Sequence, residues 1–178
     1  MAVDMPDVDG PGARGLLRTR FYPFCLTDLA SLHAVILMAA SHFGNAHGSR
    51  SHAIDMLHLR GMAISEINRA LTDPIRATSD PVIAAVAKMA AYEALFGDRG
   101  IFNTHMNGLL RIVSLRGGLP ALGLDGMLER MLLWIDSNAA HITGSKLYFD
   151  KAAFPSSVQH PQPDPQRFAG GLARRPPP

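Results

Sequence analysis

The chain has 178 residues, which suits one domain and leaves little room for two. Apolar residues make up 47% of the chain and charged residues only 18%, against about 25% in a typical soluble domain. We therefore expect much helix surface to be buried against other helices or against a partner. The net charge is only +2, and basic and acidic residues nearly balance between residues 27 and 150. This argues against direct DNA binding, which needs Lys and Arg concentrated on one face.

The cysteine content and the absence of targeting signals narrow the class further. Cys25 is the only cysteine, which excludes an internal disulfide and a zinc site built on paired cysteines, and it predicts a small buried or half-buried thiol. The start of the sequence is acidic and rich in turn formers, unlike a secretory signal. The longest apolar stretch, residues 34–40, is far shorter than the roughly 20 residues of a membrane helix. We expect a soluble protein in a reducing compartment, neither secreted nor in contact with a membrane.

The first two predicted helices span residues 27–43 and 51–71. Thr27 or Asp28 is the expected N-cap of the first, with Gly44 as its stop and a polar loop over residues 45–49. The residue before a proline leaves the helical region, so Asp73-Pro74 ends the second helix. The side chains expected to face the core are Leu29, Leu32, Val35, Ile36, Ala39 and Phe43 in the first helix, and Ile54, Leu57, Gly61, Ile64 and Leu71 in the second.

Three further helices are predicted over residues 81–96, 101–116 and 125–142. The third helix of the chain begins at a Ser79-Asp80 cap with Pro81 at its first position. It is apolar nearly all round, which indicates a helix surrounded by others. Gly97 is its expected left-handed stop, and a tight turn returns the chain into the fourth helix, which ends at Gly117-Gly118. The inward residues expected in the last two helices are Phe102, Met106, Leu109, Leu110 and Val113, then Leu128, Met131, Leu132, Ile135 and Ala139.

These elements predict an all-α fold, a bundle of about five antiparallel helices packed in pairs. Residues 1–26 form an irregular N-terminal segment, residues 27–150 the helical domain, and residues 151–178 a Pro-rich tail. The composition of residues 1–20 and 151–178 predicts that both ends are disordered.

Several residues could carry chemistry, and for each a structural role is the better prediction. His33, His42, His47, His52 and His58 are not spaced three or four residues apart on one helix face, so we predict no metal site. Glu93 lies in an otherwise apolar helix, where a carboxylate must be paired or neutralised. His105, Arg111 and Arg116 on the returning helix are its expected partners. No catalytic constellation and no cofactor loop stands out.

Three stretches resemble the regulatory domain of fungal-specific transcription factors of the binuclear zinc cluster class. They are AAVAKMAAYEALFGD (84–98), HMNGLLRIVSLRGGLPALG (105–123) and MLERMLLWIDSNAAHITG (127–144), and the resemblance covers about residues 29–150. It implies an all-α regulatory domain in the nucleus, with no catalytic residues. The matching positions are expected to define the fold: Tyr92, Glu93, His105, Gly108, Arg116, Gly117 and Gly118.

The six cysteines of the zinc cluster are absent from this sequence. The resemblance therefore implies the regulatory region alone, as a truncated product, an isolated piece or a stand-alone relative. Our first hypothesis is a non-enzymatic regulatory domain that packs against a protein partner or a second copy, without direct contact to nucleic acid and with room for a small-molecule effector. The alternative is a helical protein, or an enzyme, that binds a small molecule or a metal in a cavity lined by Met and His. In that case the protein would lie in the cytoplasm.

Overall fold

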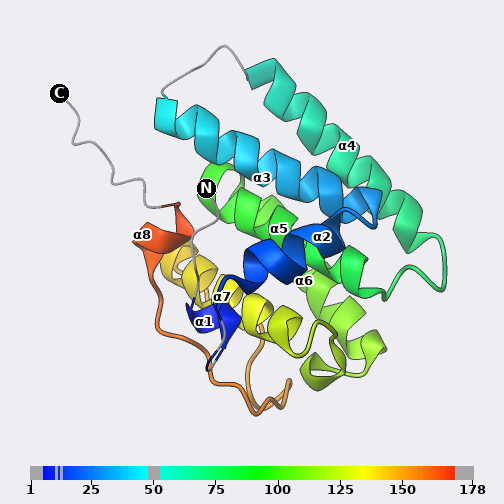
Figure 1. Ribbon diagram of the computed structural model, residues 1–178, viewed down its shortest axis with the longest axis vertical. Coiled ribbons are helices and arrows are strands. Elements are labelled where there is room, and N and C mark those ends of the chain that lie inside the picture. Colours follow the sequence, from blue (N-terminus) through cyan, green and yellow to red (C-terminus); the bar gives the residue numbers. More distant parts are fainter. Residues whose placement is uncertain (1–5, 11, 13, 48–52, 171–178) are drawn as a thin grey trace.

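The computed structural model describes residues 6–10, 12, 14–47 and 53–170, and within them all regular structure is helical (Figure 1). The five long helices are α3 (Leu29–His47), α4 (Ala53–Leu71), α5 (Asp80–Phe96), α6 (Arg99–Arg116) and α7 (Met127–Thr143). Short helical turns complete the description: α1 (Pro6–Asp9), η1 (Leu17–Phe21), α2 (Tyr22–Cys25), η2 (Leu119–Ala121) and α8 (Pro165–Phe168). The predicted all-α class and the five long helices are confirmed.

Helix α5 is the centre of the bundle and packs against α3, α4, α6 and α7. Ten of its residues are buried, as its uniformly apolar sequence predicted. The predicted pairing is also confirmed, because α3 packs on α4 and α5 packs on α6. Figure 1 shows α3 and α4 side by side across one end of the molecule, with α7 at the other.

Helix α3 begins where the sequence predicts but ends later. The carboxylate of Asp28 accepts a hydrogen bond from the backbone N–H of Ala30 at 2.8 Å, which makes Asp28 the N-cap. The helix continues through Gly44 to His47, so the predicted stop at Gly44 is wrong. Glycine permits a helix end without requiring one.

The buried stripe of α3 is a narrow one of small residues, and it differs from the predicted stripe. Ala30, Ala34, Leu37 and Ser41 are buried, whereas the predicted core residues Leu29, Ile36 and Phe43 are 47%, 40% and 60% exposed. The helix contains no Asp, Glu, Lys or Arg, so no charge in its sequence identifies the solvent side. Small side chains let α3 approach α5 closely, and this places the larger side chains outside.

Helix α4 shows the same reversal. Ala63, Ile67 and Ala70 are buried, while the predicted core residues Leu57 and Leu71 are 68% and 41% exposed. Of the other predicted positions, Gly61 is exposed and Ile64 is half-buried, and the side chain of Ile54 lies outside the described residues. In α6 and α7 the predicted inward residues are buried, except for the half-buried Leu110.

Gly117 and Gly97 each end a helix, but glycine is favoured at the two positions for different physical reasons. Gly117 ends α6, as predicted, in the left-handed conformation at φ 108°, and the N–H of Gly118 donates to Val113 O at 2.9 Å. Gly97 ends α5 at φ −117°, so the prediction of a left-handed stop there is wrong. A Cβ at Gly97 would collide with Oε2 of Glu93 and lie 2.8 Å from its Cδ, so glycine is needed there for space.

The described part of the N-terminal segment packs on α7. Asp9 is buried, and its carboxylate accepts the N–H groups of Gly15 and Leu16 at 3.0 and 2.9 Å. Nε of Arg130 on α7 donates to Val8 O at 2.8 Å. For the described residues the structure thus differs from the predicted disorder of residues 1–20. Residues 1–5, 11 and 13 lie outside the description.

Residues 145–170, which we call the strap, run back along α7. Phe149 and Phe168 are buried, and Phe168 packs edge-on against Trp134 of α7 at 5.0 Å between ring centroids. For residues 151–170 the structure thus differs from the predicted disorder. This proline-containing segment has no helical periodicity, but buried aromatic side chains and hydrogen bonds to α7 hold it in place. The end of the strap thus packs on α7 through Phe168, and residues 171–178 lie outside the description.

Candidate functional site

Three of the family-like positions, Tyr92, Glu93 and His105, meet where α4, α5 and α6 join. The Glu93 side chain is only 1% exposed, and Nε and Nη2 of Arg60 on α4 both lie 2.7 Å from its Oε1. Its Oε2 accepts the backbone N–H of Asp98 at 3.0 Å, in the turn that starts α6. One buried carboxylate therefore ties three helices together.

The predicted pairing of Glu93 is confirmed, but its partner is Arg60 and the expected partners Arg111 and Arg116 were wrong. Arg111 is exposed, and Arg116 instead lies 3.4 Å from Asp80 at the far end of α6. His105 lies close enough to Glu93 and Arg60 for the charge of each to affect the pKa of its imidazole. A helix prediction does not place α4 over α5, so it could not identify Arg60.

The electrostatics of this junction favour a structural role. Burial lowers the pKa of His105, with Glu93 opposing the shift and Arg60 adding to it. Burial and the Glu93 charge both raise the pKa of Tyr92, and the Arg60 charge opposes them. Glu93 accepts charge-assisted bonds on both oxygens and is closed to solvent, so it is not placed to exchange protons with a substrate.

The other family-like positions lie apart from this junction. Arg116, Gly117 and Gly118 form the end of α6, where Arg116 reaches Asp80 at the start of α5. Gly108 lies mid-way along α6, and a Cβ there would meet nothing within 4 Å. Gly97 is not one of the family-like positions, but the described contacts give it a clearer packing role than Gly108.

Helix α7 carries buried polar side chains that sequence reasoning missed. Asp136 is fully buried and accepts the N–H groups of Tyr148 and Phe149 at 2.9–3.1 Å. Glu129 is also buried, and it accepts the Ser156 hydroxyl at 2.6 Å. The signal was present in the sequence, because Glu129 and Asp136 lie seven residues apart on one face of an apolar helix and need partners.

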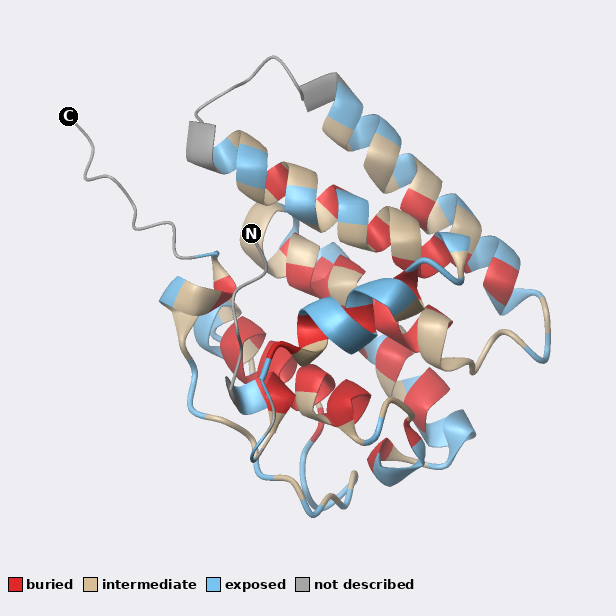
Figure 2. Ribbon diagram, in the orientation of Figure 1, coloured by how far each residue is buried: buried red, intermediate tan, exposed pale blue. Residues whose placement is uncertain are grey.

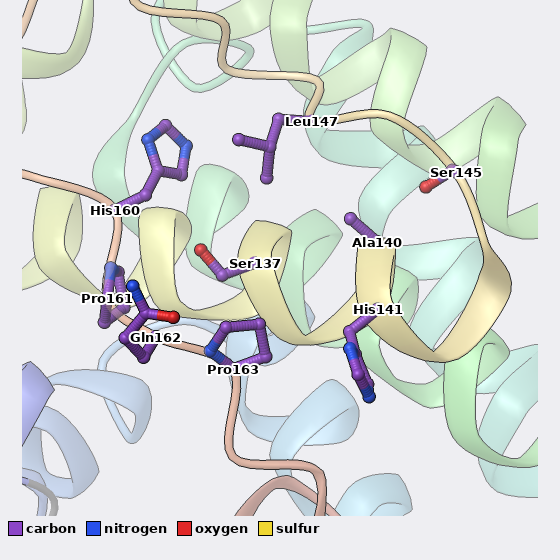
Figure 3. A pocket seen from close by; sticks show the side chains of 9 residues that line it. All are labelled: Ser137, Ala140, His141, Ser145, Leu147, His160, Pro161, Gln162 and Pro163. Carbon is purple, nitrogen blue, oxygen red and sulfur yellow. The ribbon is translucent and has the colours of Figure 1, made fainter.

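Between α7 and the strap lies a shallow hollow of about 340 Å³ (Figure 3). Ser137 lines it from α7, and its Oγ is buried without a hydrogen-bond partner among the described residues. His160 lines it from the strap, with Nε2 3.4 Å from Oδ2 of Asp136. Burial raises the pKa of Asp136, while the strap N–H groups and His160 oppose the shift. The lining contains His141 and His160 but no methionine, unlike the cavity of the alternative hypothesis.

The predicted thiol and histidine positions can also be placed. Cys25 is 1% exposed, which confirms a buried thiol, and burial raises its pKa to about 12. Nζ of Lys88 lies 5.2 Å from the centre of the Phe21 ring. In the described part of the chain no three His, Cys, Asp or Glu residues gather as metal ligands, and His52 and the side chain of His47 lie outside that part.

The surface feature that stands out is the outer face of α3, which we define as Leu29, Leu32, Ile36, Ala39 and Phe43. These positions repeat every three and four residues, the spacing of a helix–helix seam. All are exposed except the half-buried Leu32. In Figure 2 exposed residues recur along the coloured part of α3, between intermediate and buried ones. A surface helix ordinarily carries charged residues on its solvent side, and α3 has none.

Comparison with protein families identifies the family of this chain. The family model described as fungal specific transcription factor domain matches residues 10–169, which includes most of the strap. No curated protein and no solved structure matches the chain. No helix in the described part of the chain is long and apolar enough to cross a membrane.

Proposed function

Because the chain belongs to the fungal-specific transcription factor domain family, which supports a regulatory role, we propose that it regulates transcription as a non-catalytic docking module. It acts in the nucleus, through contact with a protein and without touching DNA itself. The observation that carries the docking role is the uncharged outer face of α3, whose large side chains at positions 29, 36 and 43 are 40–60% exposed.

The charge pattern supports the absence of direct DNA contact. Several arginines each lie against a carboxylate: Arg20, Arg60, Arg69, Arg76, Arg116 and Arg167. A paired arginine releases fewer counterions from a phosphate backbone than a free one. With a net charge of only +2, the chain offers little electrostatic attraction to DNA.

A tethering experiment tests the regulatory role. The chain is fused to an unrelated DNA-binding domain and placed at a reporter promoter, with the DNA-binding domain alone as control. We expect reporter output to change by several fold with the fusion, and the chain without the tether not to shift promoter DNA in a gel. An unchanged reporter, or a salt-sensitive gel shift by the chain alone, would overturn the proposal.

A further inference from the structure

We propose that the hollow between α7 and the strap binds a small uncharged molecule that carries several hydroxyl groups and has the size of a monosaccharide. This inference goes beyond the proposed docking role and does not depend on it. The hollow measures about 340 Å³, near the lower end of the range of about 300–1,000 Å³ for ligand sites in proteins. Its size therefore suits a small ligand.

Two buried polar atoms line the hollow without a hydrogen-bond partner among the described residues. Ser137 on α7 is 4% exposed, and Figure 3 shows its Oγ pointing away from the helix into the hollow. Nε2 of His160 on the strap lies 3.4 Å from Oδ2 of Asp136, which is longer than an ordinary N–H···O bond. Buried polar atoms normally have partners, so both atoms are available to a bound molecule.

The hydroxyl of Ser137 differs from two other hydroxyls on the long helices. Oγ of Ser41 donates to Leu37 O at 2.8 Å, and the hydroxyl of Thr143 donates to Ala139 O at 2.7 Å. Both form the usual bond of a helical hydroxyl to the carbonyl four residues earlier. Ser137 makes no such bond, so its hydroxyl can both donate and accept a hydrogen bond in the hollow.

The lining favours an uncharged ligand. Among the described residues that line the hollow there is no Asp, Glu, Lys or Arg, so nothing there balances the charge of an anion or a cation. The nearby carboxylate of Asp136 already accepts the N–H groups of Tyr148 and Phe149, and it would repel an anion. A cation would meet only the imidazoles of His141 and His160, which repel it when protonated.

The lining combines apolar and polar contacts in the way that a sugar requires. Leu147 and Pro163 offer apolar surface, on which the C–H groups of a sugar ring can pack. Ser137, His160 and Gln162 carry separate hydrogen-bonding groups, which a molecule with a single polar group could not satisfy together. A ligand with hydroxyls around an apolar ring face meets both requirements and bridges α7 and the strap.

The test is a titration of the isotope-labelled full chain with D-glucose, D-xylose and D-mannitol, followed by NMR. We expect at least one of these neutral probes to bind in the millimolar range and to shift the backbone amide signals around Ser137, Leu147 and Gln162. Glucuronate and glucosamine are charged counterparts of glucose and should bind about tenfold more weakly than the neutral probe. The proposal is overturned if no neutral probe binds, if the shifted signals lie elsewhere, or if a charged counterpart binds as tightly.

A Ser137→Ala variant separates a ligand role of the hydroxyl from a structural one. It should raise the Kd of the neutral probe about 3- to 10-fold, the effect of one hydrogen bond between uncharged groups. It should not lower Tm, because the hydroxyl has no partner within the described chain to lose. The matched control is Ser41→Ala, which loses the bond to Leu37 O and should lower Tm without changing the Kd. A lowered Tm with an unchanged Kd for Ser137→Ala would reject the ligand role.

An Ala140→Leu variant tests the location of the ligand by volume. Ala140 lines the hollow from α7 and is half-buried, so a leucine side chain there would fill part of the hollow. Leucine is a good helix former, and Tm should stay close to that of the wild type while binding of the neutral probe is lost. An Ala140→Leu variant with the wild-type Kd would place the ligand outside the hollow and overturn the proposal.

Discussion

At the end of α5 the Glu93 side chain lies close to Gly97, and a pair of glycine substitutions tests this approach. Replacing Gly97 by alanine puts a methyl group where the Glu93 carboxylate lies, with Cδ at 2.8 Å and Cα at 3.0 Å. The carboxylate must move, because the backbone Cα cannot. Its hydrogen bond from Asp98 N–H is then lost, and its pairing with Arg60 is disturbed. Gly108→Ala is the matched control, since a Cβ there meets nothing within 4 Å.

The magnitudes follow from these contacts. A hydrogen bond to a charged group contributes about 1.5–3 kcal/mol to the free energy of unfolding. Replacing glycine by alanine offsets about 0.4–1 kcal/mol of its loss, because alanine reduces the conformational freedom of the unfolded chain. Gly97→Ala should therefore lower the free energy of unfolding by about 1–2 kcal/mol. Gly108→Ala breaks no hydrogen bond, so only the stabilising effect remains. In a helix interior alanine is more favourable than glycine by up to about 1 kcal/mol.

Thermal unfolding followed by circular dichroism measures both effects. For a chain of this size 1 kcal/mol moves Tm by about 2–4 °C, so Gly97→Ala should lower Tm by about 2–8 °C and Gly108→Ala should raise it by about 1–4 °C. A Gly97→Ala variant as stable as the wild type would refute the close approach of Glu93. A lower Tm for Gly108→Ala would refute the open space on α6.

Three further measurements address single side chains. Glu93→Gln removes the charge that pairs with Arg60 at 2.7 Å and should lower the free energy of unfolding by about 1–3 kcal/mol; an unchanged denaturant midpoint would count against the pair. Burial, with the Lys88 charge, lowers the pKa of His42, so the unfolded chain binds the proton more readily and stability should fall as pH drops through about 6.5. His42→Gln should then flatten the plot of Tm against pH, and an equally steep plot would contradict the burial effect. The Cys25 thiol, 1% exposed with its pKa raised to about 12 by burial, should react with a thiol reagent at pH 8 only after unfolding, and fast labelling of the native chain would disagree.

What the sequence could predict was set by local physics. The cap of α3, predicted at Thr27 or Asp28, and the end of α6 at Gly117 depend on a few neighbouring residues, and both predictions are confirmed. Helix α5 was correctly placed inside the bundle because an apolar surface on every side leaves no solvent face. The fold-defining role of the seven family-like positions stays a prediction, although Glu93 has the contacts such a role requires.

What could not be predicted depended on how the helices meet. Periodicity in α3 gave an apolar stripe but could not tell whether that stripe faces the core or the solvent. The partner of Glu93 depended on the position of α4, which no local pattern encodes. The strap lacked periodicity altogether, and its place follows from buried groups on α7, such as Asp136, that accept N–H groups from it. In each case the missing information was the relative placement of two segments.

Charged residues make up 18% of the chain; α3 has none, whereas α5 has three, Asp80, Lys88 and Glu93, and is otherwise apolar. In α5 neighbouring helices enclose ten residues, so the folded chain alone explains the apolar sequence. In α3 only one narrow stripe is enclosed, and the opposite side carries large apolar side chains without a charge among them. Exposed apolar surface of this extent raises the free energy of the isolated chain relative to an assembly that covers it. The folded chain alone therefore does not explain why the outer side of α3 is apolar and free of charged residues, and this observation is the basis of the proposed docking role.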